Sequence, residues 1–421
     1  MIHQTKSGPA RREFLKVAGM GMLGLALPEL SIAQPKPAKE LLVYVGTYTS
    51  GKSEGIYLYS LNLTSGELSH VSTTKGVVDP SFLALAPSRR FLYAVNELEN
   101  FEGKKSGAVS AFAVDQRTGQ LRFLNQQPSL GGAPCYVEID SAGRFALVAN
   151  YFGGNVAVLP VKRDGRLGPA TDMQQYQGSS VHPENQLSPH AHCIVLDAAN
   201  RFAYSCDLGT DKIMIFRFDA RSGKLRAGEQ PSVTVKPGSG PRHLAFHPSG
   251  KYMFVLNELT STVTAFARDQ RKGSLKELQT LTTLPEGFTG ANSGADIHVS
   301  SDGRFLYSSN RGHHSIAIFM IDGRGALTAV GHELTGGSTP RNFGIDPTGA
   351  FLLAANQKSD NIVVFKLDRK TGRLSPTGHV AQVPSPVCLK FTAPFALGLT
   401  IDQRSAFAPA ERDVYSSNVP H

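Results

Sequence analysis

The stretch PRHLAFHPSGKYMFVLNELTSTVTAF, residues 241–266, contains three short apolar runs separated by polar turns. The first run covers 241–246 and is followed by the turn 247–250, the second covers 252–257, and the third covers 261–266. Runs of this length, rich in β-branched and aromatic residues and bounded by Gly, Pro, Asn and Ser, predict β-strands rather than helices. The short connections predict that neighbouring strands pair antiparallel.

The central run of this stretch recurs along the chain as an aromatic-rich strand. Its copies begin about 46 to 57 residues apart and lie at 41–46, 91–96, 145–150, 202–206, 252–257, 305–310 and 351–356. A second apolar run follows, and a turn such as Thr118-Gly-Gln-Leu121 then leads to a further strand. Four short strands in each of seven repeats predict an all-β fold, a seven-bladed β-propeller.

The two ends of the repeat region complement each other. No inner strand precedes 41–46, whereas Pro386-Val-Cys-Leu-Lys-Phe391 has the pattern of an inner strand without the rest of a repeat. We therefore expect N- and C-terminal strands to share one blade, which closes the ring and removes open sheet edges. The expected organisation is a signal peptide at 1–33, the propeller at 34–391 and a C-terminal tail at 392–421.

The N-terminus carries the pattern of an export signal. Arg11-Arg12-Glu13-Phe14-Leu15-Lys16 is a twin-arginine signature, and Ser31-Ile32-Ala33 supplies small residues for cleavage. The apolar stretch 17–28 between them is too short for a membrane span. The pattern predicts a periplasmic or secreted protein exported by the twin-arginine (Tat) machinery, without stable membrane insertion after cleavage. A cytosolic protein with a disordered N-terminus is the alternative.

Charge and cysteine usage exclude several function classes. The net charge is +9, but no basic run interleaved with aromatic residues occurs, which argues against nucleic-acid binding. Cys135, Cys193, Cys206 and Cys388 contain no C-x-x-C pair, so a structural zinc site is not expected. Cys193 and Cys206 should face each other across one hairpin, where a disulfide and two buried thiols both fit.

Overlaying the repeats brings two sets of positions to one end of the ring. Inner strands start, and the next strands end, at the same mouth of the channel because they are antiparallel neighbours. The positions at the inner-strand starts are Ser81, Cys135, His192, Arg242, Ala295, Arg341 and Val387, and those after the next strands are Thr47, Glu97, Tyr151, Asp207, Glu258, Arg311 and Gln357. Three arginines, three carboxylates and a histidine predict a functional site. The alternative is that the mouth is polar because water fills it.

Several segments resemble the lactonase family of seven-bladed propellers, which includes bacterial 6-phosphogluconolactonase and fungal carboxy-muconate lactonizing enzymes. These segments are GPRHLAFHP at 240–248, NEL at 257–259, ADIH at 295–298, NR at 310–311, PRNF at 340–343 and QKS at 357–359. The resemblance implies a catalytic set of His192, Arg242, Glu258 and Arg311. The remaining mouth positions expected to bind substrate are Arg341, Glu97, Asp207, Tyr151 and Gln357. No metal or cofactor is expected.

These residue types suit the opening of a lactone ring. The reaction needs a base that activates water and a cation that stabilises the developing oxyanion. Glu258 and His192 are the candidate bases. Arg242 and Arg311, assisted by Arg341, are the candidate groups for the oxyanion or for an anionic arm of the substrate. We therefore expect hydrolysis of a sugar-type lactone to the open-chain acid.

Other functions fit the same sequence. A non-catalytic propeller that binds an anionic ligand or a partner protein is one, since this fold hosts many functions. A muconate-type lactonizing isomerase is another, and a metal-dependent gluconolactonase is disfavoured because no carboxylate-and-Asn ligand cluster is found. Export also departs from the cytosolic setting of 6-phosphogluconolactone, so a free sugar lactone is as good a candidate as a phosphorylated one.

Overall fold

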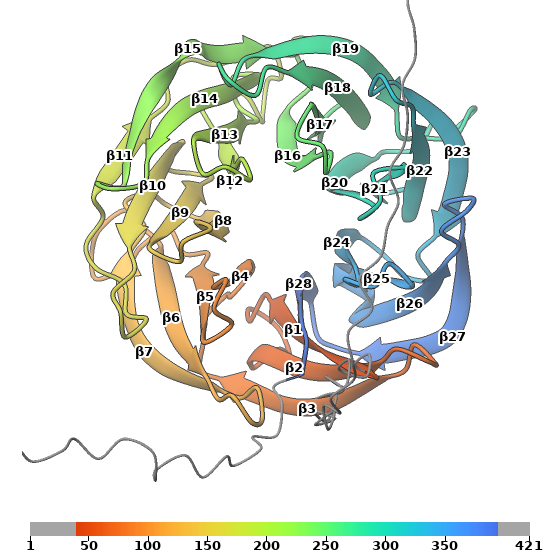
Figure 1. Ribbon diagram of the computed structural model, residues 1–421, viewed down its shortest axis with the longest axis horizontal. Helices are drawn as coiled ribbons and strands as arrows, with labels where there is room; N and C mark the ends of the chain where they lie inside the picture. The colour runs from red at the N-terminus through yellow and green to blue at the C-terminus, as the bar shows by residue number, and fades with distance from the viewer. Residues whose placement is uncertain (1–38, 395–421) are drawn as a thin grey trace, which may run out of the picture. The chain divides into compact units, whose positions relative to one another are not determined.

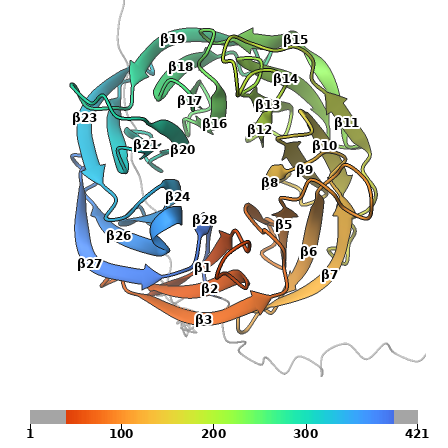
Figure 2. The same cartoon turned by 180° about the vertical axis from the view of Figure 1, so that it is seen from behind.

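The computed structural model describes residues 39–394, which form a ring of seven four-stranded antiparallel sheets (Figure 1). Each sheet is a blade whose first strand lies beside the central channel and whose last strand lies at the rim, as the view from behind also shows (Figure 2). The predicted all-β, seven-bladed propeller is confirmed. Among the described residues the one helical segment is a 3₁₀ turn, η1 (Gln357–Ser359).

The strand bounds follow, blade by blade and from the channel outward. Blades 1 to 3 contain β28 (Pro386–Thr392), β1 (Glu40–Thr47), β2 (Gly55–Asn62) and β3 (Leu68–Lys75); β4 (Leu83–Leu85), β5 (Phe91–Asn96), β6 (Ala108–Val114) and β7 (Leu121–Pro128); β8 (Pro134–Ile139), β9 (Phe145–Asn150), β10 (Asn155–Pro160) and β11 (Asp172–Gln175). Blades 4 and 5 contain β12 (Ala191–Leu196), β13 (Phe202–Asp207), β14 (Lys212–Asp219) and β15 (Lys224–Thr234); β16 (Pro241–Phe246), β17 (Tyr252–Asn257), β18 (Thr262–Arg268) and β19 (Leu275–Thr282). Blades 6 and 7 contain β20 (Ser293–Val299), β21 (Phe305–Arg311), β22 (Ser315–Ile321) and β23 (Leu327–Leu334); β24 (Pro340–Ile345), β25 (Phe351–Asn356), β26 (Asn361–Leu367) and β27 (Leu374–Gln382).

Blade 1 joins the two ends of the repeat region. The C-terminal strand β28 pairs antiparallel with β1, from Leu42 opposite Thr392 to Gly46 opposite Cys388. The predicted shared blade is therefore confirmed, and its inner strand ends one residue beyond the expected end of the propeller. The expected signal peptide at 1–33, and the tail from residue 395 onward, lie outside the described residues.

The aromatic-rich strands lie where the repeat predicted them. β5, β9, β17 and β25 have the expected bounds, while β13 and β21 each run one residue further, to Asp207 and Arg311. Strands such as β9 are buried along their whole length because neighbouring blades cover both faces of the sheet. A strand covered on both faces has a continuous apolar sequence rather than an alternating one, as the run 145–150 shows.

Aromatic side chains of these strands fasten each blade to the next. The buried Tyr204 hydroxyl of blade 4 donates to the Gly273 carbonyl of blade 5, at 2.7 Å. At the closure of the ring, Phe351 of blade 7 lies so close to Gly66 of blade 1 that a β-carbon on that glycine would come 2.8 Å from the phenyl ring. The recurring aromatic residues and the recurring Gly-containing turns are thus two halves of one contact between blades.

The cysteines are internal. All four are buried free thiols, and Cys193 in β12 is the register partner of Cys206 in β13, as the hairpin predicted. The structure therefore has the two-thiol alternative rather than the disulfide. Within residues 39–394 no helix has the length and apolar character that crossing a membrane requires.

Candidate active site

The site begins with an irregularity that recurs where the inner strands start. In five blades the pairing between the inner strand and the next one skips a residue; the skipped residues are Cys135, His192, Arg242, Arg341 and Val387. A β-bulge leaves such a residue without a pairing partner and re-aims its side chain. Five of the seven inner-strand positions expected at the mouth are therefore bulge positions, which explains why their side chains leave the regular alternation of the strand.

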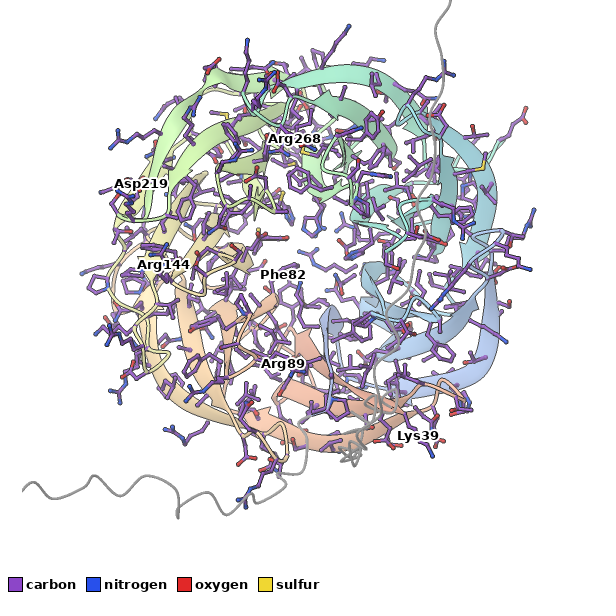
Figure 3. All side chains as sticks on the ribbon, in the orientation of Figure 1. Lys39, Phe82, Arg89, Arg144, Asp219 and Arg268 are labelled. Carbon is purple, nitrogen blue, oxygen red and sulfur yellow. The ribbon has the colours of Figure 1, made fainter. Side chains whose placement is uncertain are left out.

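A narrow cavity lies at this mouth, with room for about one water molecule. Its lining residues come from five blades and are Ser81, Phe82, Glu97, Cys135, Arg242, His243, Arg341, Asn342 and Val387. Side chains crowd around the channel, and Phe82 lies near the centre of the ring (Figure 3). The cavity is thus polar on most of its wall, with Phe82 and Val387 as its apolar part.

Three of the four residues implied as catalytic form one ion-pair cluster. Glu258, the residue after β17, lies 3.0 Å from Arg242 Nε and 2.8 Å from an Nη of Arg311. The Arg242 side chain is 2% exposed, and its Nη1 donates to the Ala295 carbonyl. Arg311 also donates to the Gly294 carbonyl at 2.8 Å. Both guanidiniums are thereby fixed between a carboxylate and the start of β20.

The charges of this cluster are set by its own members. Burial would raise the pKa of Glu258, but Arg311, Arg242 and Arg341 outweigh burial and lower that pKa below its ordinary value. Burial, together with Arg341 and Arg311, lowers the pKa of Arg242 to about 10. Glu258 is therefore ionised and Arg242 charged at neutral pH, so the cluster carries a net positive charge.

A second carboxyl group, Glu97, lies at the cavity in different surroundings. The Tyr48 hydroxyl lies 3.0 Å from each of its oxygens, and the Ser81 hydroxyl donates to Oε2. Burial raises the pKa of Glu97, although the charge of Arg341 opposes this. The Arg341 guanidinium lies 5.4 Å from the centroid of the Tyr48 ring and forms no ion pair within residues 39–394. Arg341 is thus an available cation at the cavity.

His192, the fourth residue implied as catalytic, lies beside Cys135 rather than in the ion-pair cluster. Its Nδ1 is 3.6 Å from Cys135 Sγ, and its ring meets those of Tyr151 and His243 edge-on, with centroids 5.5 and 5.2 Å away. Burial, followed by the charge of Arg242, lowers the pKa of His192 well below its ordinary value. The imidazole is therefore neutral at neutral pH.

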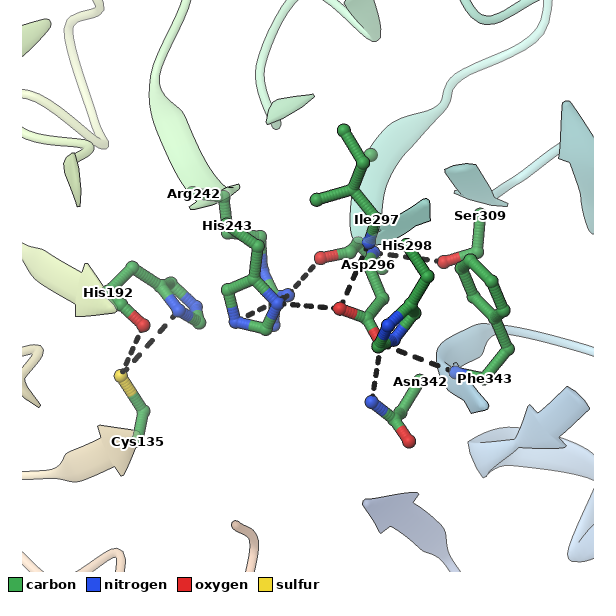
Figure 4. Close-up of polar contacts among 12 residues, drawn as sticks. Cys135, His192, Arg242, His243, Asp296, Ile297, His298, Ser309, Asn342 and Phe343 are labelled. Atoms are coloured by element: carbon green, nitrogen blue, oxygen red, sulfur yellow. Dashed lines mark hydrogen bonds and ion pairs between the residues drawn. The ribbon is translucent and has the colours of Figure 1, made fainter. Parts of the chain in front are cut away.

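Asp296 joins the inner strands of blades 5, 6 and 7 (Figure 4). Its Oδ1 lies 2.8 Å from His243 Nδ1, and its Oδ2 lies 2.9 Å from His298 Nε2 and accepts from Asn342 Nδ2. Burial would raise the pKa of Asp296, but His298 and His243 hold it well below its ordinary value. Burial and Arg242 lower the pKa of His243 to about 4. Asp296 is therefore an ionised acceptor with both oxygens occupied, which indicates a structural role.

Three of the expected substrate-binding residues have other surroundings. The Asp207 carboxylate is fully buried and accepts from the amides of His190 and Gly209, at 2.7 and 3.1 Å, and from the Thr210 hydroxyl. Asp207 therefore holds a loop. Tyr151 stacks on His190 with ring centroids 4.4 Å apart. Gln357 opens the turn η1, where it is half-buried.

The position after the first strand is shifted by one residue from the expectation. Thr47 was expected at the mouth, but it is fully buried, and its hydroxyl bonds Ser53 Oγ and the Gly55 carbonyl, both at 2.6 Å. The pairing of β1 with β28 shifts at Thr47, and the next residue, Tyr48, reaches Glu97. Sequence reasoning missed Tyr48 because the repeat places the first strand copy at 41–46, one residue early. Thr47 pairs with Pro386 as Asn257 pairs with Pro241, so Tyr48 is the true counterpart of Glu258.

A closed propeller with arginines and carboxyl groups around one mouth defines a class, namely propeller proteins that hold a small polar or anionic molecule at the channel. The model of the family described as "Lactonase, 7-bladed beta-propeller" matches residues 42–391. The chain therefore belongs to the lactonase family of seven-bladed propellers, and its class of activity is that of a lactonase hydrolase.

Individual relatives cover nearly the whole propeller. The chain is 38% identical over 349 residues to the 6-phosphogluconolactonase of Bacillus subtilis, which covers 83% of this chain and 97% of that protein. It is 38% identical over 296 residues to the 6-phosphogluconolactonase of Formosa agariphila, covering 69% and 82%. The structure of the periplasmic gluconolactonase of Pseudomonas aeruginosa superimposes with a TM-score of 0.80 at 36% identity, covering 84% of this chain and 99% of that one.

Proposed function

We propose that this protein hydrolyses a sugar-type lactone to the open-chain acid at the cavity between Glu97, Arg242 and Arg341. The observation that carries the proposal is the Arg341 guanidinium, which borders the cavity without an ion-pair partner within residues 39–394. A cation in a partly desolvated cavity attracts a carbonyl oxygen as it becomes an oxyanion, and it also binds an anionic substituent. Family membership favours hydrolysis over the binding-protein and isomerase alternatives.

The arrangement supplies the two things that lactone opening needs. Arg242 and Arg341 both line the cavity and provide positive charge for the oxyanion. Glu258 holds Arg242 through an ion pair of 3.0 Å, so that this guanidinium is positioned before substrate arrives. Attack by water on the carbonyl carbon, followed by cleavage of the ring C–O bond, gives the hydroxy acid.

Two substrate types remain within this class. The named relatives include 6-phosphogluconolactonases and a periplasmic gluconolactonase. An arginine-rich cavity suits a phosphorylated sugar lactone, whereas a protein exported from the cytosol would meet free sugar lactones. The substrate panel below therefore contains matched phosphorylated and free lactones.

We also propose export by the twin-arginine machinery, with the periplasm as the destination. The support is the sequence Arg11-Arg12-Glu13-Phe14-Leu15-Lys16 and the periplasmic relative from Pseudomonas aeruginosa. Replacing Arg11 and Arg12 together by Lys should leave the full-length protein in the cytosolic fraction, whereas the unaltered chain should be recovered from the periplasm. Equal recovery of both from the periplasm would contradict this route.

The activity is tested by acid release from a panel of lactones in a weakly buffered indicator assay, with spontaneous hydrolysis subtracted. The protein should release acid from at least one sugar lactone, and Arg242→Ala should reduce the rate by about 10²-fold or more, as the loss of one oxyanion donor does. Release that Arg242→Ala leaves unchanged would place the activity elsewhere. No release from any lactone by folded protein would favour a binding propeller instead.

A further inference from the structure

Building on the lactone hydrolysis proposed above, we propose that the carboxylate of Glu97, held by Tyr48 and Ser81, is the general base that takes the proton of the attacking water, and that Glu258 acts only by positioning arginines. The two carboxyl groups are chemically identical. They differ in three respects: the groups that hold each carboxyl group, whether it lines the cavity, and whether its protonation would leave arginines without a counter-charge.

Glu258 is committed to ion pairs. Both of its oxygens are used, Oε2 by Arg242 at 3.0 Å and Oε1 by Arg311 at 2.8 Å. Protonating this carboxylate would leave two guanidiniums, 2% and 13% exposed, without their counter-charge. The same arginines lower the pKa of Glu258 against the effect of burial. A carboxylate held in this way is a weak base.

Glu97 is held only by neutral hydroxyl groups. The Tyr48 hydroxyl lies 3.0 Å from both Oε1 and Oε2, the Ser81 hydroxyl donates to Oε2, and no ion pair to Glu97 occurs within residues 39–394. A hydroxyl group donates to a carboxylate and accepts from a carboxylic acid, so both protonation states of Glu97 can be accommodated. Burial raises the pKa of Glu97 despite the nearby Arg341, which makes its carboxylate the stronger base of the two.

Glu97 also has the better position. It lines the cavity together with Arg242 and Arg341, whereas Glu258 is not among the lining residues. A water molecule between Glu97 and a substrate carbonyl would thus face the base on one side and the guanidinium charge on the other. Burial raises the pKa of Tyr48 further above its ordinary value, so its hydroxyl stays protonated and remains a donor to Glu97.

Glu97 can both take the proton of the water and return it to the leaving oxygen. As the water oxygen bonds to the carbonyl carbon, Glu97 takes one water proton and the carbonyl π electrons move to the oxygen, where the arginines stabilise the negative charge. When that charge re-forms the carbonyl, the bond between the carbonyl carbon and the ring oxygen breaks. The ring oxygen takes the proton from Glu97 and becomes a hydroxyl, so that Glu97 is a carboxylate again.

The test compares three isosteric variants across pH, using whichever lactone the unaltered protein hydrolyses fastest. Glu97→Gln should lower kcat by about 10²–10⁴-fold and abolish the acid limb of the pH profile, which in the unaltered protein should lie above 4.5, the ordinary pKa of this group. Glu258→Gln should lower the rate but keep an acid limb. Glu138→Gln, at a half-buried carboxyl group that lines a different cavity formed by the inner strands, should keep both rate and limb.

Tyr48→Phe provides a second measurement that a merely structural role would not affect. Removing a donor to the carboxylate should raise the pKa of Glu97 and shift the acid limb to higher pH. If Glu97→Gln fails to fold, as judged by its unfolding transition, the shifted acid limb of Tyr48→Phe and the pH profile of Glu97→Asp test the role of Glu97 instead. An active Glu97→Gln variant with an intact acid limb, or an unshifted limb in Tyr48→Phe, would overturn the role of Glu97 while leaving the lactonase function in place. If the unaltered protein hydrolyses no lactone, the proposed function itself fails.

Discussion

The ring of Phe202 in blade 4 lies against Gly273 in blade 5, so closely that a β-carbon on Gly273 would come 2.4 Å from Phe202 Cδ1. The Gly273 carbonyl also accepts a hydrogen bond from the hydroxyl of Tyr204, which lies two residues after Phe202 in β13. Gly273 has a φ of +76°, a conformation that L side chains rarely adopt. The contact therefore needs glycine for two separate reasons, backbone conformation and space.

These two reasons can be separated by a matched pair of substitutions. Gly273→Ala should lower the free energy of unfolding by about 2–4 kcal/mol, since it combines backbone strain with overpacking against Phe202. Gly76→Ala is the control, because Gly76 has a φ of +77° and nothing within 4 Å of the added β-carbon; its cost should be about 1 kcal/mol. Urea unfolding measures both free energies. Equal losses would show that the closeness of Phe202 adds nothing to the cost of the β-carbon.

The propeller could be predicted because its contacts repeat. In six blades an aromatic residue at the start of the second strand meets a glycine in a turn of the next blade, and in blade 1 Leu42 takes its place. This contact must recur in order to fasten the blades, so the sequence has a period. The shared blade was predictable for a similar reason, since a strand pattern at 386–391 without a repeat around it needs a partner. The bulges beside Arg242 and Arg341 could not be foreseen, because a bulge changes pairing without changing residue type.

The candidate site was predictable in its residue types and only partly in its contacts. Aligning the repeats predicted that Arg242, Glu258 and Arg311 lie close together, and two ion pairs join them. Asp207 has a residue type that suits substrate binding, yet its carboxylate is used by backbone amides. Tyr48 escaped notice because the repeat places the first strand copy at 41–46, whereas the strand residue that pairs with the start of the inner strand is Thr47. Residue type alone does not tell whether a polar group is already satisfied.

Arg341 is expected to bind the anionic part of the substrate or its oxyanion. Arg341→Ala should raise KM for an anionic lactone by about 10- to 100-fold, since a charge-assisted hydrogen bond contributes about 1.5–3 kcal/mol. Steady-state kinetics with matched phosphorylated and free lactones measures the effect. Lys390→Ala is the control, because that cation lies over Phe82, 4.5 Å from the ring centroid, and lines a different cavity. A KM that Arg341→Ala leaves unchanged for every active lactone would contradict the assignment.

Glu138 should make the stability of the propeller depend on pH. Its Oε1 accepts from the Leu196 amide at 3.0 Å, and burial raises its pKa to about 8, with the amide and Lys390 offsetting part of the effect. Between the ordinary value of 4.5 and about 8, the unfolded chain is ionised at this group while the folded protein keeps the proton. Stability is therefore lost as pH rises through this window and stays reduced above it.

Replacing Glu138 by Gln removes this titration. The gain in unfolding free energy of Glu138→Gln over the unaltered protein should be small at pH 5 and reach about 1–3 kcal/mol at pH 8.5. Urea unfolding at several pH values measures the difference. Glu277→Gln, at an exposed position of β19, should show no such trend. A constant difference between pH 5 and pH 8.5 would mean that Glu138 ionises as readily in the folded protein as in the unfolded chain.

Thiol titration tests the state of the cysteine pair. Cys193 and Cys206 lie opposite each other in β12 and β13, and all four cysteines are buried as free thiols. Burial raises the pKa of Cys206 and of Cys388, which reduces the reactive thiolate further. A soluble thiol reagent should therefore react with no thiol in the native protein and with four in urea. Two reactive thiols in urea without reductant, rising to four after reduction, would instead show a disulfide between these strands, because Cys135 and Cys388 are not register partners of any cysteine.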